Sequence, residues 1–254
     1  MQRNRIMWGI VALVLLVTIA ISFGSRQSYS QKESVKAKSS EDLSKYAVAD
    51  YDAPESSNAA EREERKQKNS RYDNQKWVIK KPHPEDSGVG LFDEIPPPPL
   101  IPDVESDLVI VGEIINVSAH LSNDKRGVYS EFTIKVKQIL KNDLSKKVEQ
   151  GGQVTADRAG GFVRYPNGQK VLYMPSTRAL PMSGEEYLFF LKNDKKGPNY
   201  EIITGYELKE NDIKPLDTGR DFDEFKKLGG LNFINTVRNQ ISESLMNNTQ
   251  RKKP

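Results

Sequence analysis

The stretch LVIVGEIINV, residues 108–117, decides the fold class of this chain. Its β-branched residues follow one another almost without interruption, as is typical of a strand that is covered on both faces. Further along, Phe132, Ile134 and Val136 alternate with polar residues, which is the pattern of a half-exposed strand. The folded part of the chain is therefore expected to begin near residue 104, with β structure.

Turn signals separate the strands that follow. Gly151-Gly152 precedes an expected strand at residues 153–158. Pro166-Asn167-Gly168 favours a tight hairpin, because an Asn-Gly pair readily adopts the positive φ angles that such a turn needs. The remaining expected strands cover residues 162–165, 170–174, 187–191 and 200–204.

Near the C-terminus the apolar period changes from two to about 3.6 residues. Ile234, Val237, Ile241 and Leu245 lie on one helical stripe. Six or seven short strands followed by one helix predict a mostly β fold, a small barrel-like domain at residues 104–246 with a C-terminal helix. A polar tail, residues 247–254, ends the chain.

The order of these pieces resembles the oligonucleotide/oligosaccharide-binding (OB) barrel in its netrin- or metalloproteinase-inhibitor-like variant. The resemblance rests on Val111-Gly112-Glu113 in the first strand, Ile139-Leu140-Lys141 at the end of the second, the Gly151-Gly152 turn, and Gly184 before residues 186–191. It covers residues 104–245 and implies a five-stranded barrel closed by a helix. Inhibitors of this type use an N-terminal cysteine and disulfides, so their mechanism cannot apply to a chain without cysteine.

Arg3 and Arg5 precede an uncharged apolar run, residues 6–23, that is long enough as a helix to span about 27 Å. This length predicts a single transmembrane helix within residues 1–24. The two arginines place the N-terminus in the cytoplasm and the rest of the chain in the periplasm or outside the cell. Small residues before Ser25 leave a cleaved signal peptide, and secretion after cleavage near Gly24, as the alternative.

Residues 25–103 are expected to form a disordered linker, charged at first and proline-rich later. The charged part has too few large apolar residues to offset the entropy of ordering. Residues 61–68 have the charge spacing of a transient helix, and Tyr72, Trp77, Val78 and Ile79 form an apolar island that can dock on the next domain. The run of prolines at 96–99 favours a stiff spacer.

The sequence contains no recognisable catalytic or metal-binding pattern. There is no cysteine, and the two histidines stand apart, His83 between prolines and His120 after the first strand. Gly-x-Ser-x-Gly does not occur, and the glycine doublets lack the spacing of a phosphate-binding loop. We therefore predict no catalytic residue, metal or cofactor. A formal net charge of +3 from mixed signs argues against nucleic acid as a partner.

The most suggestive surface is the hairpin at residues 158–173, where aromatic and cationic side chains alternate around glycine turns. Rings beside guanidinium groups can stack on sugars, bases or peptide side chains, and the middle strands of such barrels often bind ligands. The alternative is that Tyr165 and Tyr173 merely pack across strands. The hypothetical ligand-binding residues are Arg158, Phe162, Arg164, Tyr165, Lys170 and Tyr173.

These features predict a membrane-tethered or exported protein that binds or scaffolds at the cell envelope, with an envelope protein or a saccharide as partner. One alternative is an envelope enzyme whose site assembles from Asp157, Glu131, His120 or serines. Another is an energy-coupling or linker protein. A deep pocket lined by His120 and carboxylates would favour the enzyme, whereas a filled barrel with a shallow aromatic face would favour binding.

Overall fold

The computed structural model describes residues 45–78, 80, 89–92, 96–143, 145–194, 197, 199–218 and 222–251. All of them belong to one compact unit of the chain. The predicted transmembrane helix at residues 6–23, the linker residues 25–44 and the last three residues of the predicted tail lie outside the described residues.

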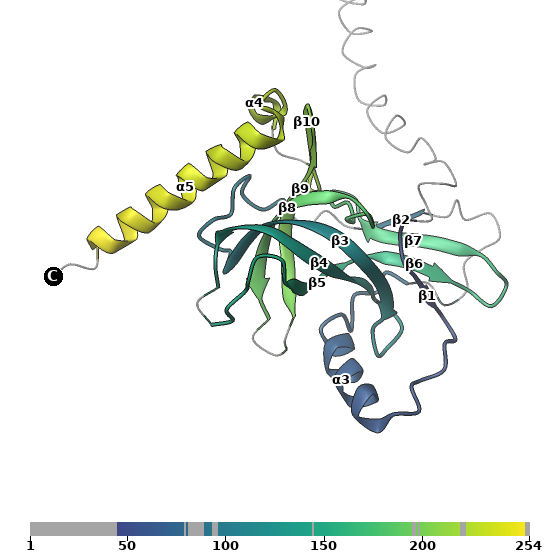
Figure 1. Ribbon diagram of the computed structural model, residues 1–254. Helices are drawn as coiled ribbons and strands as arrows, with labels where there is room; N and C mark the ends of the chain where they lie inside the picture. The colour runs from purple at the N-terminus through teal and green to yellow at the C-terminus, as the bar shows by residue number, and fades with distance from the viewer. Residues whose placement is uncertain are drawn as a thin grey trace, which may run out of the picture. The chain divides into compact units, whose positions relative to one another are not determined.

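Five strands close into a mixed barrel, shown in Figure 1. Along the barrel wall β3 pairs with β4, β4 with β5, β5 with β9, β9 with β8, and β8 with β3. All pairs are antiparallel except β5 with β9. This arrangement is compatible with an OB-like barrel and confirms the prediction of a mostly β, barrel-like domain. The strands are β3 (Leu108–Leu121), β4 (Val128–Lys141), β5 (Gln153–Ala159), β8 (Glu186–Asn193) and β9 (Tyr200–Lys209).

The inside of the barrel is filled with apolar side chains. Alternate residues of every strand point inward, among them Ile110, Phe132, Ala156 and Phe189, and each of these four has no exposed surface. Gly112 is required where β3 crosses β4, because an added Cβ would lie 2.4 Å from the Ile134 side chain. The barrel therefore has a packed core.

The C-terminal helix covers the outer face of β3, β8 and β9. This helix, α5 (Gly229–Arg251), packs on the strands through a second cluster of apolar side chains. The helix residues buried in this cluster are Phe233, Ile234, Val237 and Ile241. The short strand β10 (Asp212–Pro215) and the helix α4 (Asp223–Lys226) precede it. The predicted stripe is thus confirmed as far as Ile241, whereas Leu245 is 54% exposed. No helix among the described residues combines the length and the apolar character needed to cross a bilayer.

A second, four-stranded sheet lies beside the barrel. Its central hairpin, β6 (Gly161–Arg164) and β7 (Lys170–Pro175), is flanked on both edges by strands from earlier in the chain. These are β1 (Val48–Asp50), parallel to β6, and β2 (Val89–Phe92), parallel to β7.

Residues 45–78, which we call the strap, fold onto the barrel. The strap contains β1 and the helix α3 (Ala59–Ser70), and it buries Tyr46, Tyr72 and Val78. For these residues the structure differs from the expected disordered linker, because their charged side chains meet opposite charges on the barrel that composition cannot reveal. The predicted helix and the docking of the apolar island are confirmed for the described residues.

The proline run is also followed by chain that lies against the barrel. The Tyr206 hydroxyl donates a hydrogen bond to the Leu100 carbonyl, and Ile101 is buried. The packed domain therefore includes residues before the predicted start at 104.

Candidate functional site

Three carboxylates cross neighbouring strands on the outside of the barrel. Glu131 of β4 is the register partner of Asp157 of β5, which is in turn the partner of Glu201 of β9. Register partners point to the same face of a sheet, and the residues next to them in each strand point into the core. We call Glu131, Asp157 and Glu201 the acidic face.

Cations of the strap cover most of this face. The Arg65 guanidinium lies 3.0 Å from the Glu131 carboxylate, and the Lys68 ammonium lies 3.5 Å from it. Arg71 reaches Asp157 at 2.9 Å and Asp194, in the loop after β8, at 3.1 Å. The three cations are spaced three residues apart, which places them on one side of α3 and its C-terminal end.

An aromatic pair fixes the end of the helix. The Tyr72 ring stacks on Tyr129 with centroids 4.1 Å apart, and its hydroxyl donates to Asp157 over 2.8 Å. The Tyr129 hydroxyl donates to Asn69, 2.8 Å away, and accepts from Arg65. Tyr72 is 6% exposed, so it is an anchor of the strap.

The loop between β3 and β4 completes the contact. The Asn123 amide donates to the Lys66 carbonyl, and the backbone of Asn74 donates to Asp124. Gly127 permits the closest approach, because an added Cβ there would lie only 2.2 Å from the Tyr72 carbonyl oxygen.

The two buried carboxylates have opposite pKa shifts. Burial alone would raise the pKa of Glu131, but the hydrogen bond with His120 and the positive charges of Arg65 and Lys68 outweigh it and lower the pKa to about 2. Burial dominates at Asp157 and raises its pKa to about 6, although Arg71 and Tyr72 oppose the change. The negative charges of Glu131 and Glu201 add to the rise, so Asp157 is the less compensated of the two.

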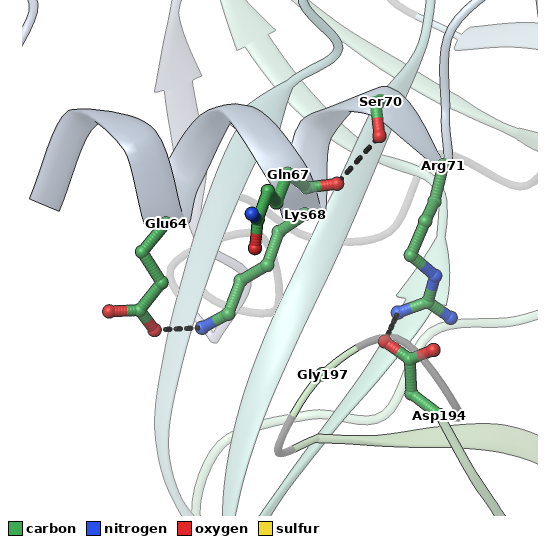
Figure 2. Close-up of a pocket in the computed structure, with 7 residues that line it drawn as sticks. All are labelled: Glu64, Gln67, Lys68, Ser70, Arg71, Asp194 and Gly197. Atoms are coloured by element: carbon green, nitrogen blue, oxygen red, sulfur yellow. Dashed lines mark hydrogen bonds and ion pairs between the residues drawn. The ribbon is translucent and has the colours of Figure 1, made fainter. Parts of the chain in front are cut away.

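A cavity of about 300 Å³ opens between α3 and the loop after β8. Figure 2 shows Lys68 paired with Glu64 and Arg71 paired with Asp194 along its wall. His120 and the acidic face are not among its lining residues, which are Glu64, Gln67, Lys68, Ser70, Arg71, Asp194 and Gly197.

The structure places most of the predicted ligand-binding residues against the protein itself. Arg158, Phe162, Tyr165 and Tyr173 are buried, while Arg164 and Lys170 are exposed. Phe162 faces the barrel core and Tyr165 the opposite side, as the period of two predicts. The Tyr165 and Tyr173 hydroxyls are hydrogen-bonded at 2.7 Å, in agreement with cross-strand packing.

The partner of this hairpin is the beginning of the strap. Tyr46 packs on Phe162, Tyr51 stacks on Tyr165, and Asp50 forms an ion pair with Arg164. Arg158 instead pairs with Asp217, 2.5 Å away. The aromatic and cationic pattern thus marks a real contact surface, and in this structure the chain's own residues 46–51 occupy it.

Three residues considered for an enzyme, His120, Glu131 and Asp157, lie close together, but both carboxylates are buried. His120 Nε2 lies 3.4 Å from Glu131, whose strand neighbour is Asp157. Asp157 has no exposed surface. Within the described part of the chain, no group of three or more His, Asp or Glu side chains is arranged to hold a metal ion.

The sequence did not identify Arg65, Lys68 and Arg71 as the residues that pair with the acidic face. Their three-residue spacing was a signal in the sequence, but only the register of β4 with β5 supplies the matching carboxylates. The fold and this face define a small closed barrel that holds a cationic segment on its outer wall. No known protein family and no curated protein sequence matches the chain.

Proposed function

We propose that this protein is a membrane-tethered binding or scaffolding module of the cell envelope. Residues 6–23 are its anchor, Arg3 and Arg5 keep the N-terminus in the cytoplasm, and the barrel lies on the outer side. The netrin-like variant of the OB barrel is the proposed type, supported by the strand order and the C-terminal helix.

The observation that carries the proposal is the acidic face. The barrel core is filled, so a ligand would have to bind on the outside. There, the face and the two adjoining loops already hold a polypeptide segment through Arg65, Arg71 and Tyr72. OB barrels commonly use the corresponding middle strands and loops for binding.

The test is photo-crosslinking from the full chain in its native envelope. A photoreactive residue replaces Glu201, an exposed position on the acidic face, and in a matched chain it replaces Glu243, exposed on α5. We expect a discrete adduct from position 201 that is absent from position 243. No adduct at 201, or the same adducts from both positions, would overturn the proposal.

Location and anchoring are tested separately. Protease added to cells with an opened outer layer should digest the barrel region, and the mass of the mature N-terminus should include residues 1–24. A mature chain that begins near residue 25 would replace the anchor with a cleaved signal.

An envelope enzyme is the second candidate, because Asp157 and Glu131 have pKa values that are shifted in opposite directions, as in acid–base pairs. Two observations favour binding over catalysis. The strap covers Asp157 completely, and the cavity beside α3 has neither carboxylate in its wall.

A further inference from the structure

We infer that α3 is an internal occupant of the acidic face, and that the face binds a cationic helix of another protein in its place. This inference rests on the proposed function and adds the chemistry of the partner. The partner carries three cationic side chains at three-residue spacing followed by an aromatic residue, as Arg65, Lys68, Arg71 and Tyr72 do.

The helix itself is held by polar contacts. No residue of α3 is buried, and its contacts with the barrel are ion pairs and hydrogen bonds. The cationic side chains of these ion pairs are 14–36% exposed, so salt can screen the pairs. The apolar anchors lie outside the helix, Tyr46 before it and Tyr72 and Val78 after it. A partner whose ring stacks on Tyr129 displaces Tyr72 together with the helix, while Tyr46 and Val78 stay in place. The helix can therefore leave the face while the core of the barrel stays intact.

Charge selects the kind of occupant. Three cations of the strap form ion pairs with Glu131, Asp157 and Asp194. A fourth carboxylate, that of Glu201, lies beside Asp157 on the neighbouring strand. Burial is the main cause of the raised pKa of Asp157, and the negative charges of Glu131 and Glu201 add to the rise. When α3 leaves, the negative charge of the face is uncompensated. An incoming cationic segment restores compensation, whereas nucleic acids and anionic lipids are repelled.

The spacing of the carboxylates on the acidic face indicates that the partner is a peptide helix. The cations contact Glu131, Asp157 and Asp194, which belong to three separate elements, and three-residue spacing on a helix reaches all of them. Tyr129 adds a flat surface on which the following ring stacks. A small polyamine could satisfy the charges but would leave Tyr129 without its stacking partner.

The first experiment opens the face in the full chain. Arg65→Gln, Lys68→Gln and Arg71→Gln together weaken docking of the chain's own helix, and Lys66→Gln, at an exposed α3 position, is the matched control. The probe is a synthetic peptide of residues 57–78, and its affinity is measured by fluorescence anisotropy. We expect the triple variant to bind the peptide about tenfold more tightly than the wild type or the control, because the internal competitor is lost.

Two control measurements test whether binding of the peptide depends on the carboxylates of the acidic face. Adding Glu131→Gln and Asp157→Asn to the triple variant should abolish binding, and raising the salt concentration should weaken it. Thermal melting reports whether each variant is folded. In the wild type, where folding is not in question, an excess of peptide should accelerate amide hydrogen exchange in α3 of a ¹⁵N-labelled chain, since the two helices compete.

The outcomes separate the two proposals. If a folded triple variant does not bind the peptide, and α3 of the wild type exchanges at the same rate with or without it, the cationic-helix inference is overturned. A crosslink from position 201 in that case would still support the acidic face as a binding surface for a different partner. Absence of both would overturn both.

Discussion

Folding buries the carboxyl group of Asp157, and this burial disfavours its negatively charged form. It has no exposed surface, and its carboxylate is held by Arg71 and Tyr72 between the strap and β5. Its pKa of about 6, against 3.8 for an unperturbed aspartate, means that the folded protein binds the proton more tightly than the unfolded chain does. Folding is therefore favoured by protonation of this group.

Asp157 makes the stability of the folded protein depend on pH. The contribution of Asp157 to stability is fully present below pH 3.8 and is lost as the pH rises through 6, about 3 kcal/mol for two pKa units. We expect the free energy of unfolding in urea to fall between pH 4.5 and 7.5. Asp157→Asn should remove most of this fall.

Glu131 does not confuse the measurement, because its lowered pKa makes it lose stability only as the pH falls below about 4.5 and towards 2. An equal pH dependence in the wild type and in Asp157→Asn would contradict the assignment.

Gly127 lies so close to Tyr72 of the strap that a larger residue does not fit there. Gly127→Ala places a methyl group 2.2 Å from the Tyr72 carbonyl oxygen, so the strap must shift. We expect a loss of about 1–3 kcal/mol in the free energy of unfolding and faster proteolysis within residues 45–78. Lys147→Ala, at a side chain that is 84% exposed, should change stability by no more than about 0.5 kcal/mol. Unchanged proteolysis of the strap in Gly127→Ala would count against the close contact.

At the scale of elements, α5 stabilises the barrel by packing rather than by charge. Phe233 lies edge-on to Tyr206, with centroids 4.8 Å apart, and has no exposed surface. The helix thus contrasts with α3, which buries no residue.

This contrast predicts different effects of substitution along α5. Phe233→Ala should lower the free energy of unfolding by about 3–5 kcal/mol, since it leaves a cavity between the helix and the barrel. Leu231→Ala is the control on the same helix, because Leu231 is 80% exposed and should cost little. Urea denaturation measures both, and similar losses would show that the helix packs differently.

The sequence could predict individual strands and the C-terminal helix, but not the contacts between distant parts of the chain. Strands and the C-terminal helix were predictable because their apolar periods are local. The contact of residues 46–51 with the 158–173 hairpin, and of α3 with β4 and β5, was not, because each depends on strand register between residues up to 114 positions apart. Polar composition suggested disorder for the strap, while its stability comes from partners elsewhere in the chain.

At the scale of the whole molecule, the folded unit includes the strap. A chain that begins at residue 96 lacks the burial of Tyr46, Tyr72 and Val78 and leaves Asp157 and Glu131 without their cations. We expect its melting temperature to lie at least about 5 °C below that of a chain that begins at residue 45. Equal melting temperatures would mean that the strap adds no stability to the barrel.

Docking of the strap also sets how far the barrel can travel from a membrane. If residues 6–23 are anchored as proposed, only about 20 residues separate the bilayer from the docked strap, and these can extend to roughly 70 Å at most. Release of the strap as far as β2 would lengthen the leash to about 65 residues and its limit to roughly 230 Å. A partner that displaces α3 and loosens the strap would therefore let the barrel reach farther from the membrane. In this way, an exchange of ion pairs at the acidic face would increase the volume that the barrel can search.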